Sequence, residues 1–116
     1  MAHLEEFLRL ADDARTRVPE IDAEEARRRV AEGAVLIDVR DADELSATPS
    51  IPGAINLSRG RIELKIADAV PDREAPLVLY CGGGNRSVLA ADSLRALGYR
   101  QVFNLRGGLK AWQGAD

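Results

Sequence analysis

The residues best suited to chemistry lie together in the segment Cys81-Gly82-Gly83-Gly84-Asn85-Arg86-Ser87. Cys81 is the only cysteine of the chain, and it directly follows an apolar run at residues 77–80. Three glycines in succession allow the backbone to curl so that several N–H groups point into one hollow. Arg86 is the only charged residue of the segment, so we expect the hollow to be electropositive.

A cysteine in this setting is expected to ionise readily. The N-terminus of a helix and a nearby cation both lower the pKa of a thiol from about 8.5, and apolar residues recur at helical spacing from Val88 onward. The only histidine, His3, lies near the start of the chain, so the thiolate must form without a histidine base. By residue type alone, a cysteine at the end of a strand is more typical of core packing. The glycines, Arg86 and the strand–loop–helix context together favour a nucleophile.

Two other kinds of site fit the segment poorly. A phosphate-binding loop of the Walker type ends in Gly-Lys-Ser or Gly-Lys-Thr, and this segment contains no lysine. A single cysteine cannot build a cysteine-rich zinc site or an internal disulfide. We therefore expect neither kind of site in this segment.

Length and composition indicate one globular domain. The chain has 116 residues, of which 46% are hydrophobic and 30% charged. The net charge of −3 argues against a nucleic-acid partner. No apolar run approaches the roughly 20 residues that span a bilayer, so no membrane partner is expected. Residues 1–10 lack the apolar stretch of a signal peptide, so we expect a cytoplasmic location.

The elements that must position the segment alternate along the chain. Short apolar runs predict strands at residues 35–39, 54–57, 77–80 and 101–105. Helical spacing, capping residues and glycine stops predict helices at residues 3–16, 23–32, 61–69 and 88–97, with shorter turns at 41–45 and 109–113. This alternation predicts an α/β fold with a mostly parallel sheet. We expect residues 1–18 to form an N-terminal helical extension, packed on the domain or on a second copy, and residues 19–116 to form the domain.

Polar residues also follow the other predicted strands. Asp38 and Arg40 end one strand and Arg106 ends another, so all three should share a rim with Cys81. A charged pair at a strand end is more often structural than catalytic. Trp112 is expected to pack the C-terminus onto the core, and the arginines at 27–29 to form a solvated helix face.

Four segments, in order, resemble the rhodanese-like (thiosulfate sulfurtransferase) family. They are the segment at 81–87, Leu36-Ile37-Asp38-Val39-Arg40 followed by Glu44, Ile51-Pro52-Gly53-Ala54-Ile55-Asn56, and Asn104-Leu105-Arg106-Gly107-Gly108-Leu109-Lys110-Ala111-Trp112. The resemblance covers residues 19–114 and leaves out the opening helix. It implies a three-layer sandwich whose central, mostly parallel sheet has five strands and helices on both faces.

The resemblance also implies a function, sulfur transfer in two steps. Cys81 would take a sulfane sulfur from a donor such as thiosulfate as a persulfide, and a thiol or cyanide acceptor would remove it. Cys81 and Arg86 would be catalytic, and the substrate would be bound by Gly82, Gly83, Gly84, Asn85 and Ser87. No cofactor and no metal would be needed. A protein acceptor is possible, and the chain would act as a monomer or weak homodimer.

The chain departs from the family at two positions. Many relatives carry histidine where this chain has Ser50. Many also carry a charged or larger polar residue where it has Gly82, so the mouth of the pocket should be less cationic.

Two alternative functions stay open. The first alternative is a persulfide relay or sensor module for a protein partner. The second is a phosphatase or arsenate reductase on the same fold. Those enzymes have one more residue between cysteine and arginine, and a phosphatase needs a general acid, for which Asp38 is a candidate.

Overall fold

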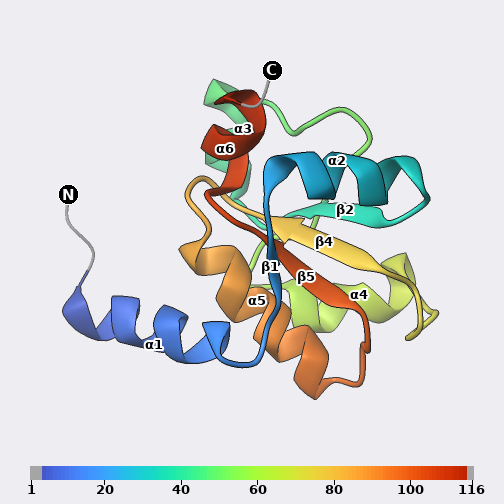
Figure 1. The fold of residues 1–116 in the computed structure, drawn as a ribbon, viewed down its shortest axis with the longest axis horizontal. Helices are drawn as coiled ribbons and strands as arrows, with labels where there is room; N and C mark the ends of the chain where they lie inside the picture. The colour runs from blue at the N-terminus through green and yellow to red at the C-terminus, as the bar shows by residue number, and fades with distance from the viewer. Residues whose placement is uncertain (1–3, 115–116) are drawn as a thin grey trace.

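The computed structural model describes residues 4–114 and places one parallel sheet between two layers of helices (Figure 1). The sheet order is β1-β5-β4-β2-β3, and every neighbouring pair is parallel. Its strands are β1 (Glu20–Ile21), β2 (Val35–Asp38), β3 (Ile55–Asn56), β4 (Leu77–Tyr80) and β5 (Val102–Leu105). The five-stranded α/β sandwich implied by the resemblance is thereby confirmed.

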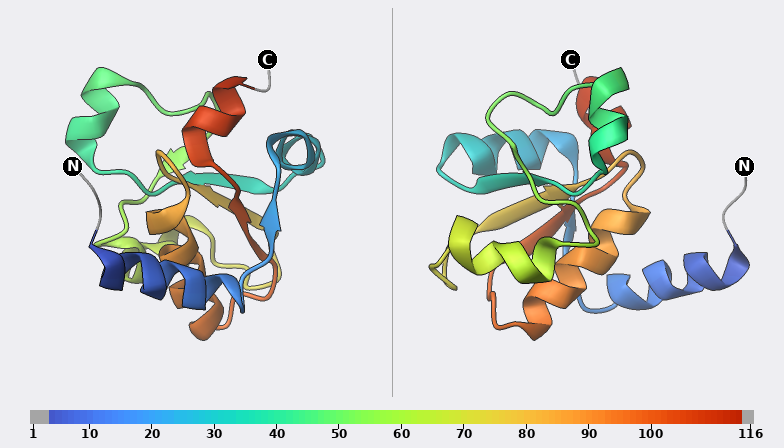
Figure 2. Two further views of the ribbon diagram at one scale, coloured as in Figure 1. Left: turned by 60° about the vertical axis from the view of Figure 1, so that its left-hand side comes forward. Right: turned by 180° about the vertical axis from the view of Figure 1, so that it is seen from behind.

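The helices divide between the two faces of the sheet (Figure 2). They are α1 (Glu5–Arg15), α2 (Ala23–Ala31), α3 (Ala42–Ala47), α4 (Ile62–Ala69), α5 (Asn85–Ala96) and α6 (Gly108–Gly114). Buried residues of α1, α4 and α5 form one core with Ile37, Leu77 and Leu79. Buried residues of α2 and α6 form the other core with Leu36 and Val78. Adjacent residues of a strand thus contribute to opposite cores, as the alternation of strand side chains requires.

The central strand β4 sets the position of the cysteine. All four of its residues are buried, which agrees with a strand covered on both faces. β4 lies between β5 and β2, so the ends of three strands meet where Cys81 leaves the sheet. The fifth strand, β1, has only two residues and pairs with β5, and the apolar pattern of the sequence did not predict it.

The buried residues of the opening helix lie in its second half. Ala11 and Ala14 are fully buried, and α1 lies against α5. Leu4 is 73% exposed and Leu8 39% exposed, and the first turns of α1 extend away from the sheet (Figure 1). Of the apolar face predicted for this helix, Ala11 is buried, whereas Leu4 and Leu8 are exposed to solvent. His3 lies outside the described residues. No helix within residues 4–114 is long and apolar enough to cross a membrane.

Candidate active site

The loop after β4 is short because α5 begins at Asn85, so only Cys81 and three glycines separate strand from helix. Cys81 is 1% exposed. The N–H group of Gly84 donates to its sulfur at 3.1 Å. Gly84 adopts a φ of 104°, a left-handed conformation that favours glycine. This turn aims the first N–H groups of α5 at the sulfur.

The other two glycines are not required by backbone conformation. Of the three, only Gly84 has a left-handed φ. A Cβ on Gly83 would meet nothing within 4 Å, and one on Gly82 would contact Arg86 at an ordinary 3.6 Å. Of the three glycines that allow the loop to curl, only Gly84 is thus required by its backbone conformation.

The start of α6 contacts the backbone of the loop that carries Cys81. The N–H group of Leu109 donates to the Cys81 carbonyl oxygen at 2.8 Å. Gly108 has a φ of 60°, and a Cβ there would lie 2.5 Å from the same oxygen. Any side chain at residue 108 would therefore displace the loop. The sequence did not predict this role, although the Gly107-Gly108 pair after a predicted strand was a signal for it.

Hydrogen bonds make the Cys81 thiol more acidic despite its burial. Burial by itself raises the pKa of Cys81, because a thiolate loses hydration in the interior. The Ser87 hydroxyl and the N–H groups of Ser87, Gly84 and Gly83 act in the opposite direction, and they outweigh burial. The pKa of Cys81 is therefore lowered, in the direction predicted from the sequence. The hydrogen-bonding groups of the loop are its cause.

Arg86 forms an ion pair with an acid of α3. Its two terminal nitrogens bind the two carboxylate oxygens of Glu44 at 2.5 and 2.9 Å. This hydrogen-bonded pair lowers the pKa of Glu44 and raises that of Arg86, so both side chains stay charged. The charge of Arg86 is therefore paired with that of a residue 42 positions away, a contact that the sequence did not predict.

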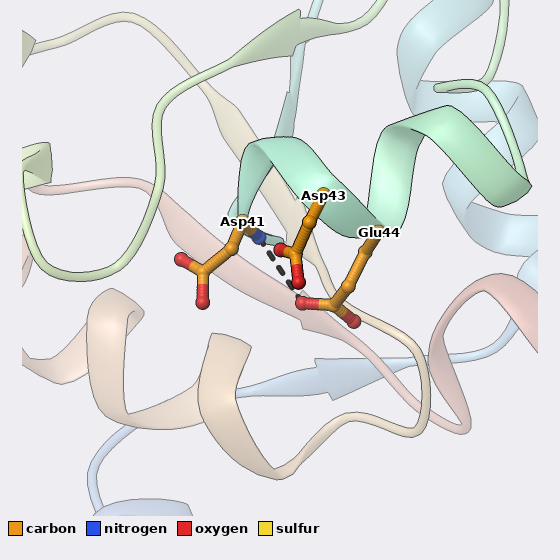
Figure 3. Close-up of side chains that lie close together, drawn as sticks. All are labelled: Asp41, Asp43 and Glu44. Atoms are coloured by element: carbon orange, nitrogen blue, oxygen red, sulfur yellow. Dashed lines mark hydrogen bonds between the residues drawn. The ribbon is translucent and has the colours of Figure 1, made fainter.

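Glu44 belongs to a group of three acids at the start of α3. Asp41, Asp43 and Glu44 have carboxylate oxygens within 4.8 Å of one another (Figure 3). Glu44 also accepts from the backbone N–H of Asp41 at 3.1 Å, and both its oxygens bind Arg86. Acids are favourable in the first turn of a helix because of the helix dipole. These contacts account for the group, and we assign no metal to it.

Two adjoining hollows open onto the loop. The smaller, of about 270 Å³, is lined by Cys81, Gly83, Asn85 and Arg86. The larger, of about 430 Å³, shares Arg86 with it and is lined otherwise by Val39, Asp41, Arg59, Gly60, Glu63 and Ser93. Only the smaller of the two hollows is lined by the cysteine, and it has room for a small anion or thiol.

Asp38 and Arg40 form a closed buried pair. Asp38 is 0% exposed and Arg40 is 3% exposed. Arg40 Nη2 donates to Asp38 Oδ2 at 2.8 Å, and that oxygen also accepts from the hydroxyls of Ser50 and Tyr80. Burial disfavours the carboxylate, but these donors outweigh it, so the pKa of Asp38 is lowered. The pair is structural in its contacts, and Ser50 takes part in holding it.

The other residues considered in the sequence have contacts of their own. Arg106 is exposed, and its Nε is 4.0 Å from Glu20. Trp112 packs against the core to which α2 and α6 contribute, as expected, and Arg27 lies over its ring at 4.3 Å. Arg29 likewise lies over Phe103. The expectation of a simple solvated face at residues 27–29 is therefore wrong for two of the three arginines.

The only cysteine of the chain is held by N–H groups at the start of a helix, at the end of a strand in a parallel α/β sheet. This arrangement is typical of proteins that use a thiolate as nucleophile. Residues 22–115 match the family model of the rhodanese-like domain. The chain belongs to this family.

The names of similar proteins indicate the reaction. A sulfurtransferase of Allochromatium vinosum is 39% identical over 97 residues, which cover 82% of this chain and 88% of that one. The thiosulfate sulfurtransferase GlpE of Pseudomonas savastanoi pv. phaseolicola is 37% identical over 98 residues, covering 84% and 90%. The prediction of a rhodanese-type sulfurtransferase is confirmed at this level.

Solved structures agree with the fold. The polysulfide-sulfur transferase homodimer of Wolinella succinogenes has a TM-score of 0.80 at 31% identity, covering 95% of this chain and 83% of that one. A Rhodopseudomonas palustris protein of unknown function, described as a possible tyrosine phosphatase, has a TM-score of 0.86 at 26% identity, covering 99% and 94%. Both cover more of this chain than the sequence relatives do, so their likeness extends into the opening residues.

Proposed function

We propose that the protein carries a sulfane sulfur as a persulfide on Cys81, with thiosulfate as a donor and a small thiol or cyanide as acceptor. The observation that carries the proposal is the Gly84 N–H donated to the sulfur at 3.1 Å, at the wall of a hollow of about 270 Å³. That hollow has room for a small donor. The names of the relatives, among them thiosulfate sulfurtransferases, support the donor class.

The proposed reaction has two displacements. The Cys81 thiolate attacks the outer sulfur of thiosulfate, the S–S bond breaks, and sulfite leaves with the bonding electron pair. The acceptor then attacks the outer sulfur of the persulfide, and Cys81 leaves as a thiolate. Backbone N–H groups that face the cysteine stabilise negative charge on its sulfur in both steps. Arg86 and the loop residues Gly82, Gly83, Asn85 and Ser87 complete the proposed site.

Intact mass spectrometry tests this proposal. Thiosulfate should add the mass of one sulfur atom to the protein, and cyanide or a thiol should remove it. Cys81→Ser should gain no mass, whereas Ser93→Ala, changed at the wall of the larger hollow, should gain it normally. A parallel incubation with polysulfide distinguishes the two donor classes. Sulfur transfer that persists in Cys81→Ser would overturn the mechanism.

Sulfur is favoured over phosphate as the transferred group. Six residues run from Cys81 through Arg86, one fewer than in the related phosphatases and arsenate reductases. Asp38, the acid considered from the sequence as a proton donor, is buried and bound to Arg40. We therefore expect no significant hydrolysis of an aryl phosphate. A protein acceptor, the oligomeric state and a cytoplasmic location stay predictions.

A further inference from the structure

The Ser87 hydroxyl has two neighbours that compete for its single proton. Its Oγ lies 3.4 Å from the Cys81 sulfur and 2.6 Å from Oδ1 of Asn104. Ser87 and Asn104 are 0% exposed and Cys81 is 1% exposed, so water does not relieve the competition. A hydroxyl donates one proton. The hydroxyl can therefore serve the sulfur or Asn104, but not both.

The direction of the Asn104 amide is fixed from its other end. Its Nδ2 donates to the Gly84 carbonyl oxygen at 3.1 Å and to the Glu20 carboxylate at 2.8 Å. Both partners are acceptors only, so the amide cannot turn over without losing both hydrogen bonds. Oδ1 must then face Ser87. Because Oδ1 cannot donate, the Ser87 proton lies toward Asn104 while the sulfur is neutral.

The N-terminal helix holds this arrangement in place. Nε of Arg15, in α1, donates to Glu20 at 3.0 Å. Nη2 of the same side chain donates to Oδ1 of Asn85 at 2.9 Å, beside the cysteine loop. Arg15 and Glu20 both precede residues 22–115, the part that matches the family model. The opening part of this chain is therefore connected to the sulfur through Asn104 and Ser87.

We propose that Asn104 is a positioning residue that holds the Ser87 proton while Cys81 is neutral and yields it when the sulfur carries negative charge. Yielding the proton leaves Oδ1 of Asn104 buried without a donor, which costs free energy. Asn104 therefore restrains the ionisation of Cys81. A thiolate that is stabilised less is a stronger nucleophile. Glu20 and Arg15 act by fixing the direction of Asn104.

The charged groups around this cluster lie in two sets of ion pairs. On the loop side, Arg86 of α5 pairs with Glu44 of α3; on the α1 side, Arg15 pairs with Glu20 of β1. Arg106, after β5, lies 4.0 Å from Glu20. The Arg86 pair lowers the pKa of Glu44 and raises that of Arg86, away from the range in which a thiol titrates.

Titration of the thiolate tests the inference directly. The chain has one cysteine, so thiolate absorbance in the ultraviolet reports Cys81 alone, and burial raises the pKa of Tyr80 to about 12. Asn104→Leu replaces the amide by an apolar group of similar size. Below the midpoint, the ratio of thiolate to thiol should rise about fivefold, because the Ser87 proton is no longer shared. Where Cys81 is fully ionised, its alkylation should slow by roughly twofold.

A double-mutant cycle separates this role from a structural one. Adding Ser87→Ala to Asn104→Leu should move the midpoint back to higher pH, by more than Ser87→Ala moves it in the parent. The inference would be overturned if Ser87→Ala shifted the Cys81 midpoint equally in the parent and in Asn104→Leu. It would also be overturned if Asn104→Leu folded but its Cys81 midpoint were unchanged or higher than that of the parent. Thermal unfolding checks the fold, and Asn104→Ala is the second variant, with the same direction expected.

The inference rests on the proposed role of Cys81 in sulfur transfer, but the titration needs no sulfur donor. If thiosulfate leaves the mass of Cys81 unchanged while the cycle behaves as expected, the proposed function fails and the positioning role stands. If sulfur loads normally but the shifts in the double-mutant cycle are additive, the positioning role fails and the proposed function stands. The two failures are therefore distinguishable.

Discussion

Tyr80 and Cys81 are consecutive residues, and their side chains belong to polar clusters on opposite faces of the sheet. Tyr80 points toward α2 and α6, where its hydroxyl donates to Asp38 at 2.8 Å and accepts from the Ile51 N–H at 2.9 Å. Cys81 points toward α5 and receives the Gly84 N–H. Both side chains are almost fully buried, so burial alone does not distinguish the two clusters.

The two clusters differ in whether their central polar atom is surrounded by protein groups alone or lies beside a hollow. The Asp38 carboxylate receives donors from Arg40, Ser50 and Tyr80 and borders none of the hollows described above. The sulfur of Cys81 lies at the wall of a hollow, and its donors are mainly backbone N–H groups at a helix start. A closed cluster favours one structure, whereas an open one leaves its reactive atom accessible. The comparison predicts that changes in the first cluster affect stability and changes in the second affect chemistry.

The largest expected effect is on stability at the closed cluster. Asp38→Ala leaves the Arg40 guanidinium buried without its partner, which should lower the free energy of unfolding by about 3–5 kcal/mol. Urea unfolding measures this change. Asp68→Ala, at an exposed position of α4, is the matched control and should stay within about 0.5 kcal/mol of the parent. If both substitutions cost the same, the Asp38 cluster does not stabilise the fold.

Acid should remove the same stabilisation. The folded pKa of Asp38 is lowered, so its contribution is fully present above the unfolded value of about 3.9 and is lost as pH falls through the folded pKa. The difference in unfolding free energy between parent and Asp38→Ala should therefore be constant near neutral pH. It should shrink progressively below about pH 4. A difference that stays constant down to pH 2 would contradict the lowered pKa.

At the open cluster the next effect should appear in rate. In Gly108→Ala the new Cβ would lie 2.5 Å from the Cys81 carbonyl oxygen, so the loop must move. A displacement of about 1 Å in a reacting group costs roughly 100-fold in rate, and we expect sulfur loading to slow by that order. Gly60→Ala, where a Cβ meets nothing within 4 Å, is the control and should load normally. Normal loading by Gly108→Ala would mean that α6 does not position the cysteine.

The comparison also explains how far the sequence could be interpreted. The cysteine, the strand before it and the helix after it are adjacent in sequence, so residue order alone predicted the core of the site. The contacts of Glu44 with Arg86 and of Gly108 with Cys81 join residues 42 and 27 positions apart, and no local pattern encodes them. Strand β1 has two residues, too few for any alternation to be visible. Asn104 belongs to one of the four segments that resemble the family, but a role for it can be inferred only from its buried contacts.

The smallest expected effect concerns the charge that Glu44 brings to the open cluster. Its carboxylate binds both terminal nitrogens of Arg86, so a dianionic donor meets a neutralised arginine rather than a free cation. Glu44→Gln keeps an acceptor for Arg86 but removes the negative charge. Because the pair is about one-third exposed, water screens the change. We therefore expect the KM for thiosulfate to fall only by about two- to fivefold, with kcat little changed.

Salt and a neutral acceptor sharpen this last prediction. An electrostatic gain should diminish as ionic strength rises, because the Debye length shortens from about 10 Å at 0.1 M to about 3 Å at 1 M. The rate at which an uncharged thiol removes the sulfur should be the same in parent and variant, since no donor charge is involved. Glu63→Gln, an exposed acid of the larger hollow away from Arg86's hydrogen bonds, is the matched control. If it lowers the KM as much as Glu44→Gln does, the effect reflects net charge rather than the Glu44–Arg86 pair.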